Sequence, residues 1–348
     1  MRFKKYILAV SSFAILIGCK VDPKINIVSE DELKEISPAG WPAPVYSFSN
    51  NPIKAEVFNL GRELFYDPIL SVDNTISCGS CHQQFVAFAH AEHKFSHGIN
   101  DLLGNRNAPG IFNVTWHNSF MHDGGINHIE VQPIGPIQNP IEMGEKFANV
   151  IIKLQNSAKY KQLFLKAYGT EEATDSRVLK SMAQFMGLMY SYSSKFDHYK
   201  RNEHNVKLTE EELRGYNLFQ AKCVQCHVEP LFSDFSFRNN GIAIDPLLND
   251  SGRAHITGLP QDRYKFKTPS LRNVGLTGPY MHDGRYTTLQ QCLDHYTNLQ
   301  NTINHDPLMP IGGIPLTAQE KTEIIAFLHT LTDYEFINDQ KFADPNGN

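Results

Sequence analysis

Two short motifs constrain this chain more than any other feature. The sequence CGSCH begins at Cys78, and CVQCH begins at Cys223. A Cys-x-x-Cys-His motif is the attachment signature of c-type haem, in which both thiols bond to the haem vinyl groups and the His becomes an iron ligand. We therefore expect one covalent haem c in each half of the chain. The predicted attachment residues are Cys78, Cys81, Cys223 and Cys226, and the predicted proximal iron ligands are His82 and His227.

Two other uses of paired cysteines fit this sequence less well. A thioredoxin-like redox pair needs an alternating strand and helix context, which this sequence lacks, and a zinc site does not need a His after each pair. The chain has six cysteines, so Cys19 and Cys292 lie outside both motifs. Cys292 falls on an expected helix and is most simply a buried free thiol.

An internal repeat accompanies the two motifs. The segment RNAPGIFNVTWHNSFMHDG aligns on KTPSLRNVGLTGPYMHDG without a gap, so that His122 meets His282. Each copy follows its own Cys-x-x-Cys-His motif, and each motif follows a short helical sequence, GRELF or GYNLF. Repetition of the whole unit indicates a duplication, with one chemical centre in each half.

Helical signals dominate the rest of the chain. Thr209 and Thr317 each stand three residues before a Glu, which is the capping-box pattern of a helix start. Apolar residues recur at helical spacing over 175–190 and again after Thr317. Strand-like alternation is scarce, so we expect a mainly α fold with long loops.

The N-terminus has the pattern of a targeting segment. Arg2, Lys4 and Lys5 precede an apolar run that ends in LIGC and is too short to span a bilayer. LIGC resembles a bacterial lipobox, which predicts a signal peptide over 1–18 and a lipid on Cys19; a plain secretory signal is the alternative. We expect a body anchored by lipid to a membrane on the periplasmic side of the cell envelope. The net charge of -5, without a Lys/Arg run, argues against a nucleic-acid partner.

With these motifs the chain resembles the bacterial dihaem cytochrome c peroxidase family, which includes the MauG-like enzymes. The resemblance extends over nearly all of 50–332 and rests on ISCGSCH, RNAP, GPIQNPIEM, TPSLRNVGLTGPYMHDGR and LTAQEKTEIIAFLHTLT. It implies two cytochrome c-like helical domains, at 51–203 and 204–340, after a tether and leading segment at 19–50. It also implies a Ca²⁺ ion between the domains and, as in many relatives, a homodimer.

The activity that the resemblance implies is reduction of hydrogen peroxide to water. Electrons from a small cytochrome c or copper protein would enter at the second haem and pass to the first, where peroxide binds. Gln132 and Glu142 stand at the family's distal-pocket positions. A carboxylate there can move a proton between the peroxide oxygens, and an amide can hold the peroxide by hydrogen bonds. Asn107, Thr277 and Pro279 match the family's calcium ligands, and oxygen donors suit that ion.

Three positions depart from the usual peroxidase pattern. Tyr296 stands where the second haem has a Met ligand, as in MauG-like enzymes, and Met309 is the alternative ligand. His97 lies in the loop that carries a blocking ligand of the first haem in some relatives, but its spacing is longer, so ligation stays open. His122 occupies the place of the family's inter-haem Trp, whereas His282 matches the family pattern.

Two other functions remain open at this point. A MauG-like oxidase would use the same chemistry on a side chain of a protein substrate, which Tyr296 favours and the missing Trp disfavours. A non-catalytic dihaem electron carrier would close both irons with strong ligands and would have no use for Glu142.

Overall fold

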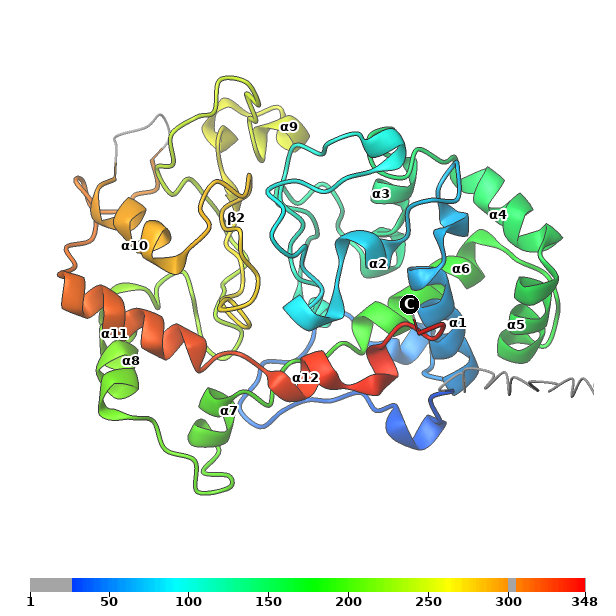
Figure 1. Ribbon diagram of the computed structural model, residues 1–348, viewed down its shortest axis with the longest axis horizontal. Coiled ribbons are helices and arrows are strands. Elements are labelled where there is room, and N and C mark those ends of the chain that lie inside the picture. The colour runs from blue at the N-terminus through cyan, green and yellow to red at the C-terminus, as the bar shows by residue number, and fades with distance from the viewer. Residues whose placement is uncertain (1–26, 300–304, 348) are drawn as a thin grey trace, which may run out of the picture.

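Figure 1 shows two mainly helical halves that lie side by side, with long loops between the helices. The structure, a computed structural model, describes residues 27–299 and 305–347. The first helices are α1 (Ala55–Tyr66), α2 (Cys78–Cys81), α3 (Ile134–Gln138), α4 (Phe147–Asn156), α5 (Ala158–Tyr168) and α6 (Asp175–Gly187). They are followed by α7 (Lys195–Lys200), α8 (Glu210–Lys222), α9 (Ala254–Thr257), α10 (Leu289–Thr297), α11 (Ala318–His329) and α12 (Tyr334–Asn338). Two short strands, β1 (Phe237–Arg238) and β2 (Phe266–Lys267), pair antiparallel. The predicted mainly α fold is confirmed.

Each half is built on one pair of closely packed helices. In the first half α1 packs on α6, and in the second half α8 packs on α11. A Cβ atom at Gly61 of α1 would collide with the carbonyl group of Ser181, and one at Gly215 of α8 would collide with that of Glu323. Only Gly therefore allows the backbones to approach so closely. The two glycines open the GRELF and GYNLF sequences, so the duplicated sequence builds the same helix contact twice.

Two equivalent asparagines anchor the loops of the repeat. Asn113 and Asn273 both adopt left-handed backbone conformations, with φ of 53° and 58°, which Asn tolerates better than most residues. Asn113 exchanges hydrogen bonds with the backbone of Ser191 at 2.9 Å in each direction. Asn273 accepts one from the backbone N–H of Asp333 at 2.8 Å. The Ser191 hydroxyl connects the hydrogen bonds of Asn113 with those of Asn273, because it accepts from the Asn273 side chain and donates to the Asp333 carboxylate.

Each half has its own apolar core, and each core takes a segment from beyond its own half of the sequence. Phe336 of α12 comes late in the chain but packs in the first core. Phe196 of α7 precedes the second half but packs in the second core. Val28 and Leu33, from the predicted leading segment, are also buried in the first core. The predicted domain boundaries stay predictions, but the exchanged segments tie the two halves together.

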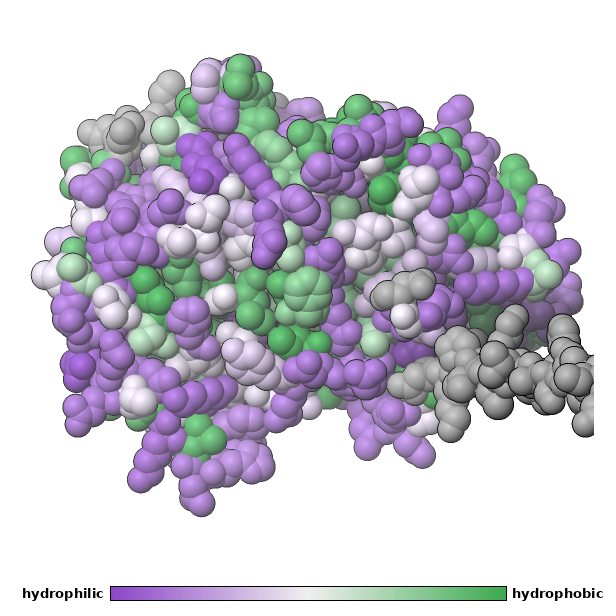
Figure 2. All heavy atoms as spheres, in the orientation of Figure 1, coloured by the Kyte–Doolittle hydropathy of each residue, from purple (hydrophilic) through white to green (hydrophobic). Residues whose placement is uncertain are grey.

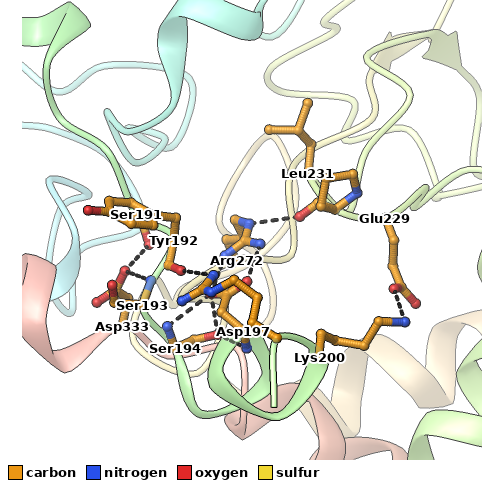
Figure 3. Close-up of polar contacts among 12 residues, drawn as sticks. Ser191, Tyr192, Ser193, Ser194, Asp197, Lys200, Glu229, Leu231, Arg272 and Asp333 are labelled. Atoms are coloured by element: carbon orange, nitrogen blue, oxygen red, sulfur yellow. Dashed lines mark hydrogen bonds and ion pairs between the residues drawn. The ribbon is translucent and has the colours of Figure 1, made fainter. Parts of the chain in front are cut away.

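A buried ion pair fastens α7 to the repeat of the second half (Figure 3). Both carboxylate oxygens of Asp197 accept hydrogen bonds from the Arg272 guanidinium, at 2.7 and 2.8 Å. The side chains are only 6% and 1% exposed. Burial alone would raise the pKa of Asp197, but the hydrogen bonds and positive charge of Arg272, together with hydrogen bonds from Ser194, lower it overall. The guanidinium also lies over the Trp41 ring, 4.6 Å from its centre.

One face of the molecule is mostly polar. On the face shown in Figure 2, hydrophilic residues cover most of the surface and apolar residues form small groups. Within the described residues, no helix combines the length and apolar character that crossing a bilayer requires. The predicted signal peptide and Cys19 lie outside the described residues.

Candidate functional site

A cavity of about 810 Å³ is lined by residues of both halves. It contains almost every site residue that the sequence predicts. Those on its wall are Cys81, His82, Asn107, His122, Gln132, Glu142, Cys223, Cys226, His227, Thr277, Pro279, His282, Tyr296 and Met309. Cys78 and His97 are not on its wall. Cys81 and Met309, which are 228 positions apart in the sequence, thus line the same space.

The two motif histidines are held in the same way. Nδ1 of His82 lies 2.7 Å from the carbonyl oxygen of Phe88, and Nδ1 of His227 lies 3.1 Å from that of Phe232. Burial lowers the pKa of both imidazoles, so both are neutral at pH 7. A neutral ring that donates its Nδ1–H to a carbonyl keeps the lone pair of Nε2 free for a metal. Both rings therefore fit the role of proximal iron ligand.

The motif cysteines fit covalent attachment. Cys78 and Cys81 sit at the two ends of α2, which Ser77 caps at its N-terminus. Cys223 and Cys226 follow α8 directly. All four thiols are unpaired, as thioether bonds to haem require. The paired thiols and the adjacent His in each half are the donor set that haem c needs.

On the first half's side of the cavity, Glu142 and Gln132 come from neighbouring turns around α3. Oε1 of Glu142 accepts a hydrogen bond of 2.6 Å from the Asn139 side chain. Burial raises the pKa of Glu142, although that hydrogen bond partly offsets the effect. The backbone N–H of Ile99 donates to the Glu142 carbonyl at 2.8 Å, and a Cβ at Gly98 would collide with the same turn. The turn that carries Glu142 is therefore held firmly.

His97 does not line the cavity. Its Nδ1 lies 2.5 Å from the carboxylate of Asp101, and its side chain is 43% exposed. Its ring packs against His93, which in turn packs against the buried His90. The backbone carbonyl of His97 lies 4.0 Å from Sγ of Cys81, but its ring is paired with Asp101, so distal ligation by His97 stays a prediction.

On the second half's side, two candidate iron ligands reach the cavity. Tyr296 lies on α10 and Met309 in the loop that follows. Burial raises the pKa of Tyr296 to about 12, while a hydrogen bond from Asn240 lowers it in part. The phenol is therefore neutral at pH 7 unless a metal ion displaces its proton. Both Tyr296 and Met309 therefore have access to the space beside the second haem motif.

The repeated MHDG loops are held crosswise, each by the other half. The backbone N–H of Asn107 donates to the carbonyl of His282 at 2.8 Å, and that of Lys267 donates to the carbonyl of His122 at 2.7 Å. Asn107 and Lys267 are equivalent positions of the repeat, so each half makes the same backbone hydrogen bond to the MHDG loop of the other half. Burial lowers the pKa of both histidines to about 4, and Nε2 of His122 donates to the Asn107 carbonyl at 2.8 Å.

Charged side chains strengthen this junction. Arg106 binds Asp123 at 2.6 Å and, from the other half, Asp250 at 2.7 Å. Arg253 donates to the backbone carbonyls of Asp123 and Gly124. The Asp and Gly of the first MHDG loop thus hold the loop against the second half.

Comparison with known proteins identifies the family. Residues 55–205 match the profile of the di-haem cytochrome c peroxidase family. The cytochrome c551 peroxidase of Nitrosomonas europaea is 33% identical over 290 residues, which cover 81% of each chain. This chain belongs to the di-haem cytochrome c peroxidase family. The methylamine utilization protein MauG of Methylorubrum extorquens is 32% identical over 293 residues, 81% of this chain and 79% of MauG. The crystal structure of a MauG-like protein associated with microbial copper homeostasis superposes with a TM-score of 0.77 at 32% identity, over 90% of this chain and 99% of that protein.

Membership in the di-haem cytochrome c peroxidase family confirms three predictions. The resemblance that the motifs indicated is correct, the chain is an oxidoreductase enzyme, and it is built to carry two haem c groups. The donor sets described above agree with this cofactor in both halves. The family alone does not separate peroxidase from MauG-like activity.

The predicted calcium ligands of this family member lie on the cavity wall near the crosswise junction. The Asn107 amide nitrogen faces the carbonyls of His93 and Lys94 at 3.3 Å. Thr277 and Pro279 come from the second half. Three residues supply only part of the six to eight oxygens that Ca²⁺ takes, so water would complete the shell.

Several cavity residues escaped the sequence reasoning. Met121 and Met281, the repeated methionines of the MHDG loops, both line the cavity with left-handed backbones. Their identity in the repeat was a signal that could have found them. Phe266 stacks on His282 with ring centres 3.7 Å apart, and Lys267 is buried, which lowers its pKa to about 8. Nothing in the local sequence marks these two.

Proposed function

We propose that this protein reduces hydrogen peroxide to water, with electrons from a small cytochrome c or copper protein. The main support is a difference between the two halves in the residues that they place on the cavity wall. The first half places Glu142 and Gln132 on the cavity wall, whereas the second offers Tyr296 and Met309, which can close an iron. Peroxide would therefore bind at the first haem, and electrons would enter at the second. Relatives named cytochrome c peroxidase support this assignment.

The chain's own residues would handle the protons. When bound, the haems supply the redox-active iron at which the oxygen–oxygen bond is cleaved. The Glu142 carboxylate accepts the proton of the inner peroxide oxygen and returns it to the outer oxygen, which leaves as water. Asn139 occupies Oε1, so Oε2 is the atom free for this transfer. The Gln132 amide donates a hydrogen bond that orients the peroxide. One peroxide, two electrons and two protons give two waters.

A steady-state assay tests the proposal. Holoprotein is mixed with hydrogen peroxide and a reduced small cytochrome c or copper protein, and oxidation of the donor is followed. We expect two donor molecules oxidised for each peroxide consumed. Absence of peroxide consumption with both kinds of donor would exclude the peroxidase assignment.

Replacing Tyr296 by Phe tests the ligand of the second haem. The phenolate oxygen favours oxidised iron, so its loss should change the second-haem absorption and EPR spectra and raise that haem's reduction potential. The first-haem spectrum should be unchanged. A Met309→Leu variant is the matched control and should leave both spectra as in the wild type. The opposite pattern, with only Met309→Leu altering the second haem, would assign Met309 instead.

The remaining predictions belong to the same proposal. Export to the periplasmic side, lipidation of Cys19, a Ca²⁺ ion held by Asn107, Thr277 and Pro279, and a homodimer would all suit an envelope peroxidase. Export and lipidation rest on the N-terminal motif, and the Ca²⁺ ion rests on the family resemblance and on the position of the three donors on the cavity wall. The homodimer rests on the family resemblance alone.

A second candidate is MauG-like oxidation of a protein side chain. Tyr296 on the cavity wall favours it, as does the similarity to MauG and to a MauG-like structure. His122 in place of an inter-haem Trp disfavours it. Rapid turnover with a small reduced donor supports the peroxidase, whereas slow donor turnover favours the oxidase.

A further inference from the structure

A cluster of metal-binding side chains lies outside the haem cavity, where the chain passes from the first half to the second. His198 is on α7, and Glu203 and His204 follow in the loop after that helix (Figure 1). One donor atom from each of the three lies within 4.8 Å of the others. The proposed peroxide chemistry uses none of them. We infer that they form a site for a divalent transition-metal ion such as Zn²⁺ or Cu²⁺, which two imidazoles and a carboxylate suit.

The His198 ring is already placed between two carboxylates. Its Nδ1 is 2.9 Å from Oε2 of Glu203, and its Nε2 is 3.5 Å from Oε1 of Glu335 on α12. A metal ion that replaces the Nδ1 proton would bind His198 and Glu203 together. The Nε2–H would then face Glu335. A carboxylate on the far nitrogen of a ligating His fixes the ring and makes it a better donor.

The turn after α7 prepares the other two ligands. Nε of Arg201 donates to Oε1 of Glu203 at 2.8 Å, which leaves Oε2 directed at His198. The backbone N–H of Glu203 donates to the His198 carbonyl at 2.9 Å and so folds the loop back. His204 has a left-handed backbone with φ of 52°, and its ring centre lies 5.1 Å from that of His198. A small closure of the loop would bring all three donors onto one ion.

Exposure and charge favour access by a cation. The side chains of His198, Glu203 and Glu335 are 15%, 40% and 70% exposed, so the site opens to solvent. Two carboxylates face the site against the single positive charge of Arg201. Three protein ligands would leave one position for water, as in open zinc sites. Because Glu335 lies on α12, the ion would link the connecting segment to the C-terminal helix.

Zinc titration of the holoprotein tests this inference. The protein is stripped with a chelator, dialysed into excess Ca²⁺ to occupy any calcium site, and titrated with Zn²⁺ by calorimetry. We expect one high-affinity Zn²⁺ per chain. His204→Asn, which keeps a residue suited to the left-handed backbone, and Glu203→Gln should each weaken binding by at least about tenfold.

The exposed His128 provides a matched control. His128→Asn removes an imidazole from the surface elsewhere and should leave the Zn²⁺ affinity unchanged. Haem absorption spectra identical to the wild type show that each variant is folded, and the readout does not depend on peroxidase activity. If the wild type binds no Zn²⁺, or if His204→Asn and Glu203→Gln bind it as tightly as the wild type, the site does not exist.

Discussion

A Glu142→Gln enzyme should have a kcat for peroxide reduction about 10²- to 10⁴-fold below that of the wild type. Gln has the size of Glu but cannot carry the proton from one peroxide oxygen to the other. The Glu142 side chain lines the cavity, and a hydrogen bond of 2.6 Å from Asn139 fixes its position. The other two carboxylates on the cavity wall, Asp123 and Asp250, are both paired with Arg106. The measurement is kcat at saturating peroxide and reduced donor.

The pH dependence of kcat gives a second readout. Glu142 must be ionised to accept a proton, and burial raises its pKa. Wild-type kcat should therefore fall as the pH drops through that raised pKa, and this acidic limb should be absent from the residual activity of Glu142→Gln. Glu130→Gln is the control, because Glu130 lies near Gln132 in sequence but bonds to Tyr46 at 2.8 Å. A kcat for Glu142→Gln within about threefold of the Glu130→Gln value would remove Glu142 from the proposed proton transfer.

An Asp197→Asn variant should lose about 3–5 kcal/mol of unfolding free energy, because it leaves the Arg272 charge buried without a partner. Arg272 is 1% exposed, so solvent cannot replace the carboxylate. The pKa of Asp197 is lowered in the folded protein. The stabilisation is therefore complete above the unfolded-state pKa of about 4 and is lost as the pH falls through the lower folded value. Guanidinium unfolding of the holoprotein, followed by circular dichroism, measures both effects.

Two controls separate the buried pair from ordinary surface charge. Glu172→Gln removes the carboxylate of an ion pair with Arg177 in which Glu172 is 66% exposed, and its unfolding midpoint should match the wild type. The double variant Asp197→Asn/Arg272→Met removes both charges and should be less destabilised than Asp197→Asn alone. Equal midpoints for Asp197→Asn and Glu172→Gln would show that the pair does not hold α7 in place.

Features written as local motifs could be predicted from the sequence. Each Cys-x-x-Cys-His motif places its thiols and imidazole within one turn of chain, so the donor sets follow from five residues. The repeat likewise predicted equivalent halves, which the glycine contacts at Gly61 and Gly215 bear out. Glu142 and Tyr296 also line the cavity. The family resemblance predicted them as site residues, whereas their local sequence did not.

Contacts between distant segments could not be predicted. The crosswise hydrogen bonds of Asn107 and Lys267 depend on how the two halves dock, which no periodicity encodes. The exchange of Phe336 into the first core has the same origin. His97 is a case in which a local position was a poor guide. Its place in the loop suggested iron ligation, but its ring is paired with Asp101, four residues later, and is partly exposed to solvent.

EPR spectroscopy of the as-isolated and half-reduced holoprotein, before and after one equivalent of hydrogen peroxide, shows whether one haem is open for peroxide beside Glu142 while the other is closed by a side chain of the second half. We expect a high-spin ferric signal from one haem in at least one of these states. Peroxide should remove this signal rapidly in the wild type and slowly in Glu142→Gln. Two low-spin irons in both redox states, unchanged by peroxide, would show that neither haem is open to peroxide and that the protein is an electron carrier.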